Sequence, residues 1–211
     1  MSYIPNIEVM KAAYPVMPVL AIENVEDAIP LAKALVAGGI KVLEVTLRTE
    51  AAMEVIKAMK TVEGAIVGAG TVSTTQQLDE LQAIGCDFAI SPGATDALLK
   101  HGKKIDMPYL PAVSTVSEVM KAAEYGYNEF KLFPASIVGG AGLLKAISGP
   151  FPAFRFCPTG GISSADYTDY LALNNVECVG GSWIVPADAL KAKDWAKIEQ
   201  LAREAVAKAK A

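Results

Sequence analysis

The amino-acid sequence predicts an α/β protein with the fold of a (β/α)₈ barrel, in one domain that spans residues 1–211. Three observations lead to this prediction. Short apolar runs alternate with amphipathic helical stretches along the chain, eight such units fit into its 211 residues, and no linker rich in Ser, Gly or Pro divides them. An open, doubly wound parallel sheet is the main alternative, because it is built from the same alternating units.

The elements follow in chain order, and a short extra helix is expected around residues 6–13, before the first strand. Strands are expected where apolar residues run continuously, since parallel strands covered by helices on both faces have no polar side. These runs are residues 16–22, 40–46, 65–71, 86–91, 107–113, 129–134, 154–159 and 176–182. The stretches between them have helical periodicity, and Asn24, Thr74 and Ser164 are expected to cap the N-termini of three helices.

A recurring pattern predicts the register of every second strand. In four places a helix ends, a stop residue follows and a strand begins; the stop residues are Gly39, Gly85, Gly126 and Asn175. The residues five positions after them are Glu44, Ile90, Lys131 and Gly180. Alternate strands of a barrel supply the four side chains of one interior layer. We therefore expect Glu44 and Lys131 to point at each other across the barrel interior.

The composition argues against several classes of function. The formal net charge of −4 leaves no surplus of Lys and Arg to neutralise a nucleic-acid backbone. No apolar stretch has the ~18 residues of a membrane span, and the N-terminal residues lack the layout of a signal peptide. His101 is the only histidine, which disfavours a zinc or iron site and a triad with a histidine base. The widely spaced Cys86, Cys157 and Cys178 are expected to be reduced, half-buried thiols of a cytoplasmic protein.

Lys131 is the candidate catalytic residue. It lies between Phe130 and Leu132, where water is expected to be scarce, and apolar surroundings favour the uncharged, nucleophilic form of an amine. Such an amine forms a Schiff base with a ketone or aldehyde. Glu44 would then transfer protons, and Arg48, four residues later, would bind a carboxylate. The alternatives are a Lys131 that reaches solvent or only pairs with Glu44, and an Arg48 that is a solvated loop residue.

Two glycine turns follow the last two predicted strands, CPTGGIS at 157–163 and CVGGSW at 178–183. Barrels often bind phosphate with the loops after strands seven and eight. Backbone N–H groups of these turns, with the hydroxyls of Thr159 and Ser182, are therefore expected to hold a phosphate group. The alternative is that these glycines only serve ordinary turns.

Longer motifs that run through nearly the whole chain can be compared with known families; they are PVMPVL, AKALVAGGIKVLEVTLRTE, AIVGAGTV, FAISPGAT, EFKLFPA, RFCPTGGIS and GGSWIVPADAL. With them the sequence resembles the class I, Schiff-base 2-keto-3-deoxy-6-phosphogluconate (KDPG) and 4-hydroxy-2-oxoglutarate (KHG) aldolases. The resemblance implies that Lys131 forms the Schiff base and that Glu44 is the acid/base. The substrate ligands that it implies are Arg48 and Thr71 for the pyruvyl carboxylate, Pro92 and Phe133 as pocket lining, and Thr159, Gly160, Gly161, Gly181 and Ser182 for the phosphate and polyol.

The resemblance also implies an activity and an assembly. The expected enzyme is a homotrimeric lyase of the Entner–Doudoroff pathway, without metal or organic cofactor, that cleaves KDPG to pyruvate and glyceraldehyde 3-phosphate and also cleaves 4-hydroxy-2-oxoglutarate. Ser136 and Ala112 depart from the family, whose members more often have Glu and Gly there, which bears on loop packing and substrate tuning. One alternative is a galactonate-series (KDPGal) aldolase, although the expected arginine is missing where the chain reads VLAIEN. The other is a non-catalytic sugar-phosphate-binding barrel, which would not need a buried amine.

Overall fold

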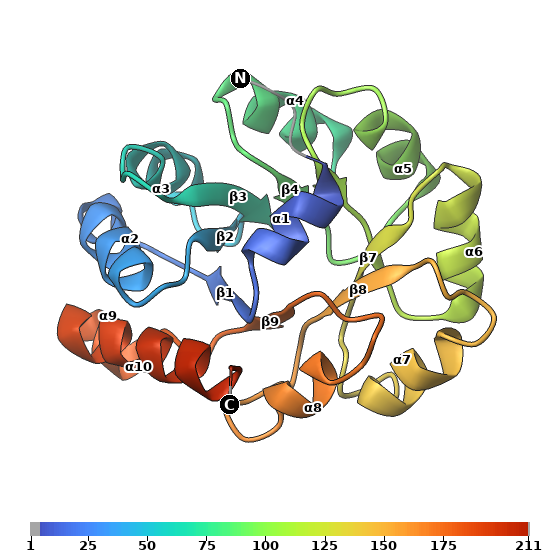
Figure 1. Cartoon of the computed structure of the whole chain (residues 1–211). Coiled ribbons are helices and arrows are strands. Elements are labelled where there is room, and N and C mark those ends of the chain that lie inside the picture. Colours follow the sequence, from blue (N-terminus) through green and yellow to red (C-terminus); the bar gives the residue numbers. More distant parts are fainter. Residues whose placement is uncertain (1–4, 211) are drawn as a thin grey trace.

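A ring of parallel strands with helices around its outside makes up the molecule (Figure 1). The structure is a computed structural model, and it describes residues 5–210. The strands are β1 (Val16–Leu20), β2 (Val42–Thr46), β3 (Ile66–Gly70), β4 (Ala89–Ile90), β5 (Tyr109–Leu110), β6 (Ala112–Val113), β7 (Glu129–Leu132), β8 (Arg155–Pro158) and β9 (Val179–Gly181). Each of the eight predicted apolar runs contains a strand, and the run 107–113 contains two, so the predicted barrel class is confirmed.

The helices alternate with the strands and cover the outside of the ring (Figure 1). They are α1 (Asn6–Ala12), α2 (Ala28–Ala37), α3 (Ala52–Met59), α4 (Thr75–Ala83), α5 (Asp96–Gly102), α6 (Val116–Glu124), α7 (Gly140–Ile147), α8 (Tyr167–Leu171), α9 (Ala187–Lys191) and α10 (Trp195–Lys208), with a 3-10 helix η1 (Val25–Asp27) before α2. The extra N-terminal helix is therefore confirmed as α1. Among residues 5–210, no helix combines the length and the apolar character that crossing a membrane requires.

The ring is closed, so the alternative of an open, doubly wound sheet is wrong. One sheet has the strand order β5-β4-β3-β2-β1-β9 and the other has the order β6-β7-β8. The bridge between Thr159 and Gly180 joins the β8 side to the β9 side. The remaining joint is Pro111, between β5 and β6, which has no N–H to donate to a strand ladder, although its carbonyl still accepts a 3.0 Å bond from the N–H of Lys131.

Side chains alternate between the barrel interior and the helix layer. In β2, Leu43 and Val45 pack with the helices in the larger core, whereas Val42 belongs to a smaller core inside the barrel. The smaller core also contains Val9 and Met10 of α1. This helix lies across one opening of the ring (Figure 1) and closes the amino end of the barrel with apolar side chains. The open end is therefore the carboxyl end of the strands.

Helix ends reproduce the predicted stop signals. The three glycines Gly39, Gly85 and Gly126 have positive φ angles of 93°, 72° and 82°, a conformation that favours glycine. In each case the N–H of the next residue bonds to a carbonyl five residues earlier, at 2.9, 3.0 and 3.2 Å. The fourth stop works differently, because the Asn175 side chain is buried and donates a 2.9 Å bond to the carbonyl of Leu144.

The predicted helix caps have three different outcomes. Thr74 caps α4 in a reciprocal capping box with Gln77, as its position before a helical run indicates. Asn24 precedes η1, but its side chain makes no capping hydrogen bond. The prediction for Ser164 is wrong, since α8 begins three residues later. There the carboxylate of Asp166 accepts 2.7 Å bonds from the N–H and the hydroxyl of Ser163, which hold this segment in a turn.

Candidate active site

Lys131 of β7 and Glu44 of β2 meet inside the barrel near its open end. Lys131 Nζ donates a 3.0 Å hydrogen bond to Glu44 Oε1, and the two residues are only 5% and 1% exposed. The neighbours Phe130 and Leu132 point the other way, into the core under the helices. The predicted pairing of Lys131 with Glu44 is therefore confirmed, and Lys131 does not reach bulk solvent.

The other two residues of the predicted layer, Ile90 and Gly180, also face the barrel interior. Ile90 belongs to the interior core, and Gly180 borders the cavity at the open end. Gly70 of β3 makes room for the carboxylate, because a Cβ at this position would lie 2.1 Å from Glu44 Oε1. Ala112, one of the departures from the family, is the register partner of Lys131 in the sheet. Small residues on the neighbouring strands therefore surround the ion pair.

A cavity of about 240 Å³ opens beside this pair. Phe133 lines it, and the centre of the Phe133 ring lies 5.6 Å from Lys131 Nζ, so one lining side chain separates the amine from the cavity. The predicted substrate ligands that line it are Arg48, Phe133, Thr159, Gly160, Gly161, Gly181 and Ser182. Thr71 and Pro92 do not line this cavity, so the structure does not bring all the predicted ligands together.

Arg48 stands at the rim of the cavity with most of its guanidinium free. Its Nε donates a 3.0 Å bond to the hydroxyl of Thr46, which in turn donates a 2.7 Å bond to the carbonyl of Leu20. Within residues 5–210 its two terminal nitrogens make no hydrogen bond, and the side chain is exposed. An arginine held at Nε can still offer both terminal N–H groups to a carboxylate.

Thr71 and Pro92 follow β3 and β4 at the open end. Thr71 has a φ of +61°, a left-handed conformation that costs energy for a residue with a branched Cβ. Backbone strain of this kind is often found at functional sites. Pro92 is exposed, while the preceding Ser91 is buried, and its hydroxyl makes a 2.6 Å bond with the Tyr109 hydroxyl.

The glycine turn after β8 lies against the loop after β7. Gly160 and Gly161 have positive φ angles of 101° and 74°, so their backbone adopts a turn that other residues rarely form. Ser136 N–H donates a 3.0 Å bond to the Gly160 carbonyl, and a Cβ on Gly161 would lie 1.9 Å from Ser136 Oγ. The second departure from the family, Ser136, thus packs directly under the turn that is predicted to hold phosphate.

The structure adds residues to the site that the sequence motifs did not single out. Val19 and Ile162 line the cavity, and Thr46 orients Arg48. Val19 is two residues after the inward-facing Met17 and is the register partner of Glu44, so its orientation follows from the pairing of β1 with β2. The hydrogen bond of Thr46 depends on how two strands meet, and no local pattern predicts it.

Two thiols form part of the floor below the ion pair. Cys157, the register partner of Lys131, and Cys178 are both free and fully buried in the interior core. The hydrogen bond with Cys157 and burial raise the pKa of the Cys178 thiol well above its usual range. Cys178 therefore stays protonated and is a poor nucleophile. Among residues 5–210, no three His, Cys, Asp or Glu side chains are grouped to hold a metal ion.

Comparison with known proteins extends over nearly the whole chain. Residues 7–201 match the family described as KDPG and KHG aldolase. The chain is 58% identical to the KHG/KDPG aldolase of Escherichia coli K12 over 197 residues, 93% of this chain and 92% of the relative. It is 57% identical to the 2-dehydro-3-deoxy-phosphogluconate aldolase of Pseudoalteromonas atlantica over 194 residues, 92% and 90% of the two chains.

A solved structure gives the same result for the fold. The KDPG aldolase of Legionella pneumophila, with pyruvate captured at low pH as a covalent carbinolamine intermediate, superimposes with a TM-score of 0.91. The two proteins are 52% identical, and the superposition covers 94% of this chain and 97% of the other. Taken together with the matches in sequence, this likeness shows that the chain belongs to the KDPG and KHG aldolase family.

Proposed function

We propose that this protein is a class I aldolase that cleaves KDPG reversibly to pyruvate and glyceraldehyde 3-phosphate, and that also cleaves 4-hydroxy-2-oxoglutarate to pyruvate and glyoxylate. The observation that carries the proposal is the buried contact between Lys131 Nζ and Glu44 Oε1, 3.0 Å apart, next to Phe133, which lines an open cavity. An amine and a carboxylate at this distance can exchange a proton directly. Two relatives that are 57% and 58% identical to this chain carry the names 2-dehydro-3-deoxy-phosphogluconate aldolase and KHG/KDPG aldolase.

In the first half of the reaction, the free amine of Lys131 attacks the C2 ketone and gives a carbinolamine, which loses water to form a protonated imine. Glu44 takes up the proton that the amine must lose before it attacks. Arg48 holds the substrate carboxylate, with Thr71 as a second ligand, which keeps C2 within reach of Lys131. The carbinolamine seen with pyruvate in the Legionella enzyme supports this step.

In the second half, the bond between C3 and C4 breaks and its electron pair moves to the protonated imine, which becomes an enamine. Glu44, directly or through water, accepts the proton of the C4 hydroxyl, and glyceraldehyde 3-phosphate leaves. A proton then returns to C3, and hydrolysis of the imine releases pyruvate and regenerates Lys131. The backbone N–H groups of Gly160 and Gly161 with Ser182 hold the phosphate, and no metal or organic cofactor takes part.

Two other functions remain as outcomes of the test. A galactonate-series aldolase would use the same Lys131 and would differ in the configuration of its substrate at C4. The chain has Ile22 and Glu23 after the first strand, where we expect an arginine in that series. A non-catalytic sugar-phosphate-binding barrel would not need the buried ion pair of Lys131 and Glu44.

Trapping with borohydride tests the proposal. We expect that borohydride with pyruvate inactivates the protein and adds a reduced pyruvyl group to the peptide containing Lys131, because borohydride reduces the imine. The control is Lys103→Met, which removes an exposed lysine away from the cavity and should leave the adduct unchanged. Protein without an adduct on Lys131 would contradict the Schiff-base mechanism and favour the binding protein. Cleavage rates with the gluconate and galactonate substrates then separate the two aldolases.

The proposal also covers the domain organisation, assembly and cellular location of the enzyme. Its 211 residues would form one domain, which would assemble into a homotrimer as is typical of the family. A cytoplasmic location is supported by the three free, buried thiols Cys86, Cys157 and Cys178, a state that is typical of reducing compartments. Gel filtration coupled to light scattering measures the assembly directly.

A further inference from the structure

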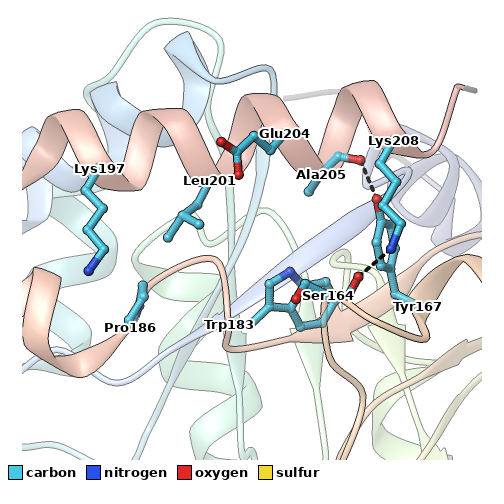
Figure 2. Close-up of a pocket in the computed structure, with 9 residues that line it drawn as sticks. All are labelled: Ser164, Tyr167, Trp183, Pro186, Lys197, Leu201, Glu204, Ala205 and Lys208. Carbon is cyan, nitrogen blue, oxygen red and sulfur yellow. Dashed lines mark hydrogen bonds between the residues drawn. The ribbon is translucent and has the colours of Figure 1, made fainter.

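A second cavity, of about 290 Å³, has its own set of lining residues (Figure 2). One wall is α10, and the other is formed by the loops that follow β8 and β9. The lining residues that matter for its chemistry are Tyr167, Trp183, Pro186, Lys197, Leu201 and Lys208. It shares no lining residue with the cavity beside Lys131, so it is a separate site.

The floor of this second cavity is aromatic and rigid. The rings of Trp183 and Tyr167 lie 5.5 Å apart, and the Tyr167 hydroxyl donates a 2.8 Å bond to the Ala205 carbonyl. The indole nitrogen of Trp183 faces the space below Leu201 (Figure 2), and it makes no hydrogen bond to any of the described residues. A half-buried indole N–H usually has a partner, so this donor can bind an acceptor on a ligand.

Four charged groups lie at this cavity, and two of them, Lys197 and Lys208, are cations that can bind an anionic group of a ligand. Lys197 and Lys208 stand at the two ends of the cavity (Figure 2), while Glu204 is the one carboxylate among its lining residues. Lys208 is held in place by a 2.6 Å bond from its Nζ to the Ser164 carbonyl, and Lys197 makes a 3.1 Å ion pair with Asp188 at the rim. Each ammonium has three N–H donors, so both can still bind a carboxylate.

The size of the cavity indicates the size of the ligand. An apolar cavity of about 150 Å³ is known to hold one benzene ring. A space of about 290 Å³ between Trp183 and Leu201 therefore accommodates two fused rings. Stacking on an aromatic floor favours a planar molecule over an aliphatic one of the same volume.

We propose that this cavity is a binding site for a bicyclic aromatic carboxylate, whose ring stacks on Trp183 and whose carboxylate lies near Lys197. We further propose that its occupancy is coupled to the barrel mouth. A Cβ on Gly181 would lie 1.8 Å from the Trp183 ring, so the ring packs directly on the backbone of a residue that lines the mouth. A ligand that holds the Trp183 ring thereby also restricts Gly181 and Ser182. This coupling rests on the proposed phosphate site.

Calorimetric titration with naphthalene-1-carboxylate tests the binding site. We expect saturable binding of one molecule per chain, which persists in Lys131→Met and is about tenfold weaker for neutral naphthalene-1-methanol. Leu201→Trp should fill the cavity and weaken binding at least about tenfold, whereas Leu201→Met, of similar volume, should not. If Leu201→Trp does not fold by circular dichroism, Leu201→Phe replaces it. Absence of saturable binding, or binding that Lys131→Met abolishes or that neither filling variant weakens, would overturn the proposal.

Titration of inorganic phosphate, with and without saturating naphthalene-1-carboxylate, tests the coupling. We expect the dissociation constant of phosphate to change at least about threefold, and that of naphthalene-1-carboxylate to change by the same factor when phosphate saturates. Two unchanged constants would refute the coupling but not the site. A protein that binds naphthalene-1-carboxylate but no phosphate would instead contradict the phosphate site of the proposed function, so the two failures can be told apart.

Discussion

The two ends of the barrel are built from the same strands but contain opposite kinds of side chain. At the amino end the interior is apolar, with Met10 of α1 packed in one core with Val42 and Phe88. At the carboxyl end the same strands place Glu44 and Lys131 inside. The change from apolar to charged interior side chains occurs within one strand, because Val42 and Glu44 are successive inward-facing residues of β2.

This contrast shows how a barrel can keep a buried ion pair. Taking two charges out of water costs several kcal/mol each, and a single pair rarely repays that cost by itself. The amino end contributes stability through well-packed apolar side chains such as Met10 and Phe88, both of which are almost fully buried. We infer that apolar packing at the amino end stabilises the fold enough to offset the cost of burying the Lys131 amine at the carboxyl end.

The largest expected effect comes from removing the amine at the open end. Lys131→Met should lower kcat by about 10³-fold or more, because no other group can form the imine. It should also lower the free energy of unfolding by about 3–5 kcal/mol, since it leaves the buried Glu44 without its partner. Steady-state kinetics and urea denaturation measure the two effects.

The double variant with Lys131→Met and Glu44→Leu separates chemistry from stability. Replacing both members of a buried ion pair with apolar residues is often neutral for stability. We expect the double variant to regain most of the stability that Lys131→Met loses, and to remain inactive. Equal instability of the single and double variants would show that the pair does not behave as one unit.

The second prediction makes the complementary change at the closed end. Met10→Ala should destabilise the protein by about 2–5 kcal/mol, because it opens a cavity in a fully buried position. The catalytic rate of the folded variant should stay within about twofold of the original, since Met10 packs in the apolar interior core and does not line the cavity. A loss of kcat at temperatures where circular dichroism shows full folding would mean that the two ends are not independent.

The ion pair at the open end could be predicted from the sequence. The glycine stops Gly39 and Gly126 recur at equal distances before Glu44 and Lys131, and a side chain five positions after the stop faces inward in both strands. This rule works because both stops end their helices with the same hydrogen bond. Because the same helix end is repeated, Glu44 and Lys131 occupy equivalent positions in their strands.

Features that depend on tertiary contacts could not be predicted in this way. The positive φ of Thr71 has no local cause in its sequence, and the start of α8 depends on the hydrogen bonds between Asp166 and Ser163. The position of Val19 at the cavity becomes clear only when its pairing with Glu44 is known. Local propensity describes single elements, whereas these features depend on which elements meet.

The third prediction concerns the glycine turn at the open end. Gly161→Ala should raise KM for KDPG by about tenfold, because the added Cβ meets Ser136 Oγ and the φ of 74° strains any other residue. The KM for 4-hydroxy-2-oxoglutarate, which has no phosphate, should change much less. Initial-rate kinetics with both substrates measure this difference.

The double variant with Gly161→Ala and Ser136→Gly separates the two causes of the expected rise in KM for KDPG. The second change removes the hydroxyl that the new Cβ meets, but it does not alter the backbone conformation that Gly161 needs. We expect partial recovery of KM for KDPG. Full recovery would mean that backbone conformation contributes nothing, and equal changes of KM for both substrates would argue against a phosphate site at this turn.

The smallest expected effect concerns a titratable group that is buried away from the open end. Burial raises the pKa of the Cys86 thiol to about 12, from its ordinary value of 9.0. The unfolded chain therefore loses this proton above about pH 9 while the folded protein keeps it, so stability falls with rising pH by about 1.4 kcal/mol per unit between these two values. Cys86→Ala should show a shallower fall over this window, measured by urea denaturation at pH 8, 9 and 10, and equal slopes for both proteins would contradict the prediction. Cys86 packs in the helix-side core and not beside Lys131, so kcat of Cys86→Ala should not change. An unchanged kcat would show that this buried titratable group, unlike Lys131 at the open end, does not affect catalysis.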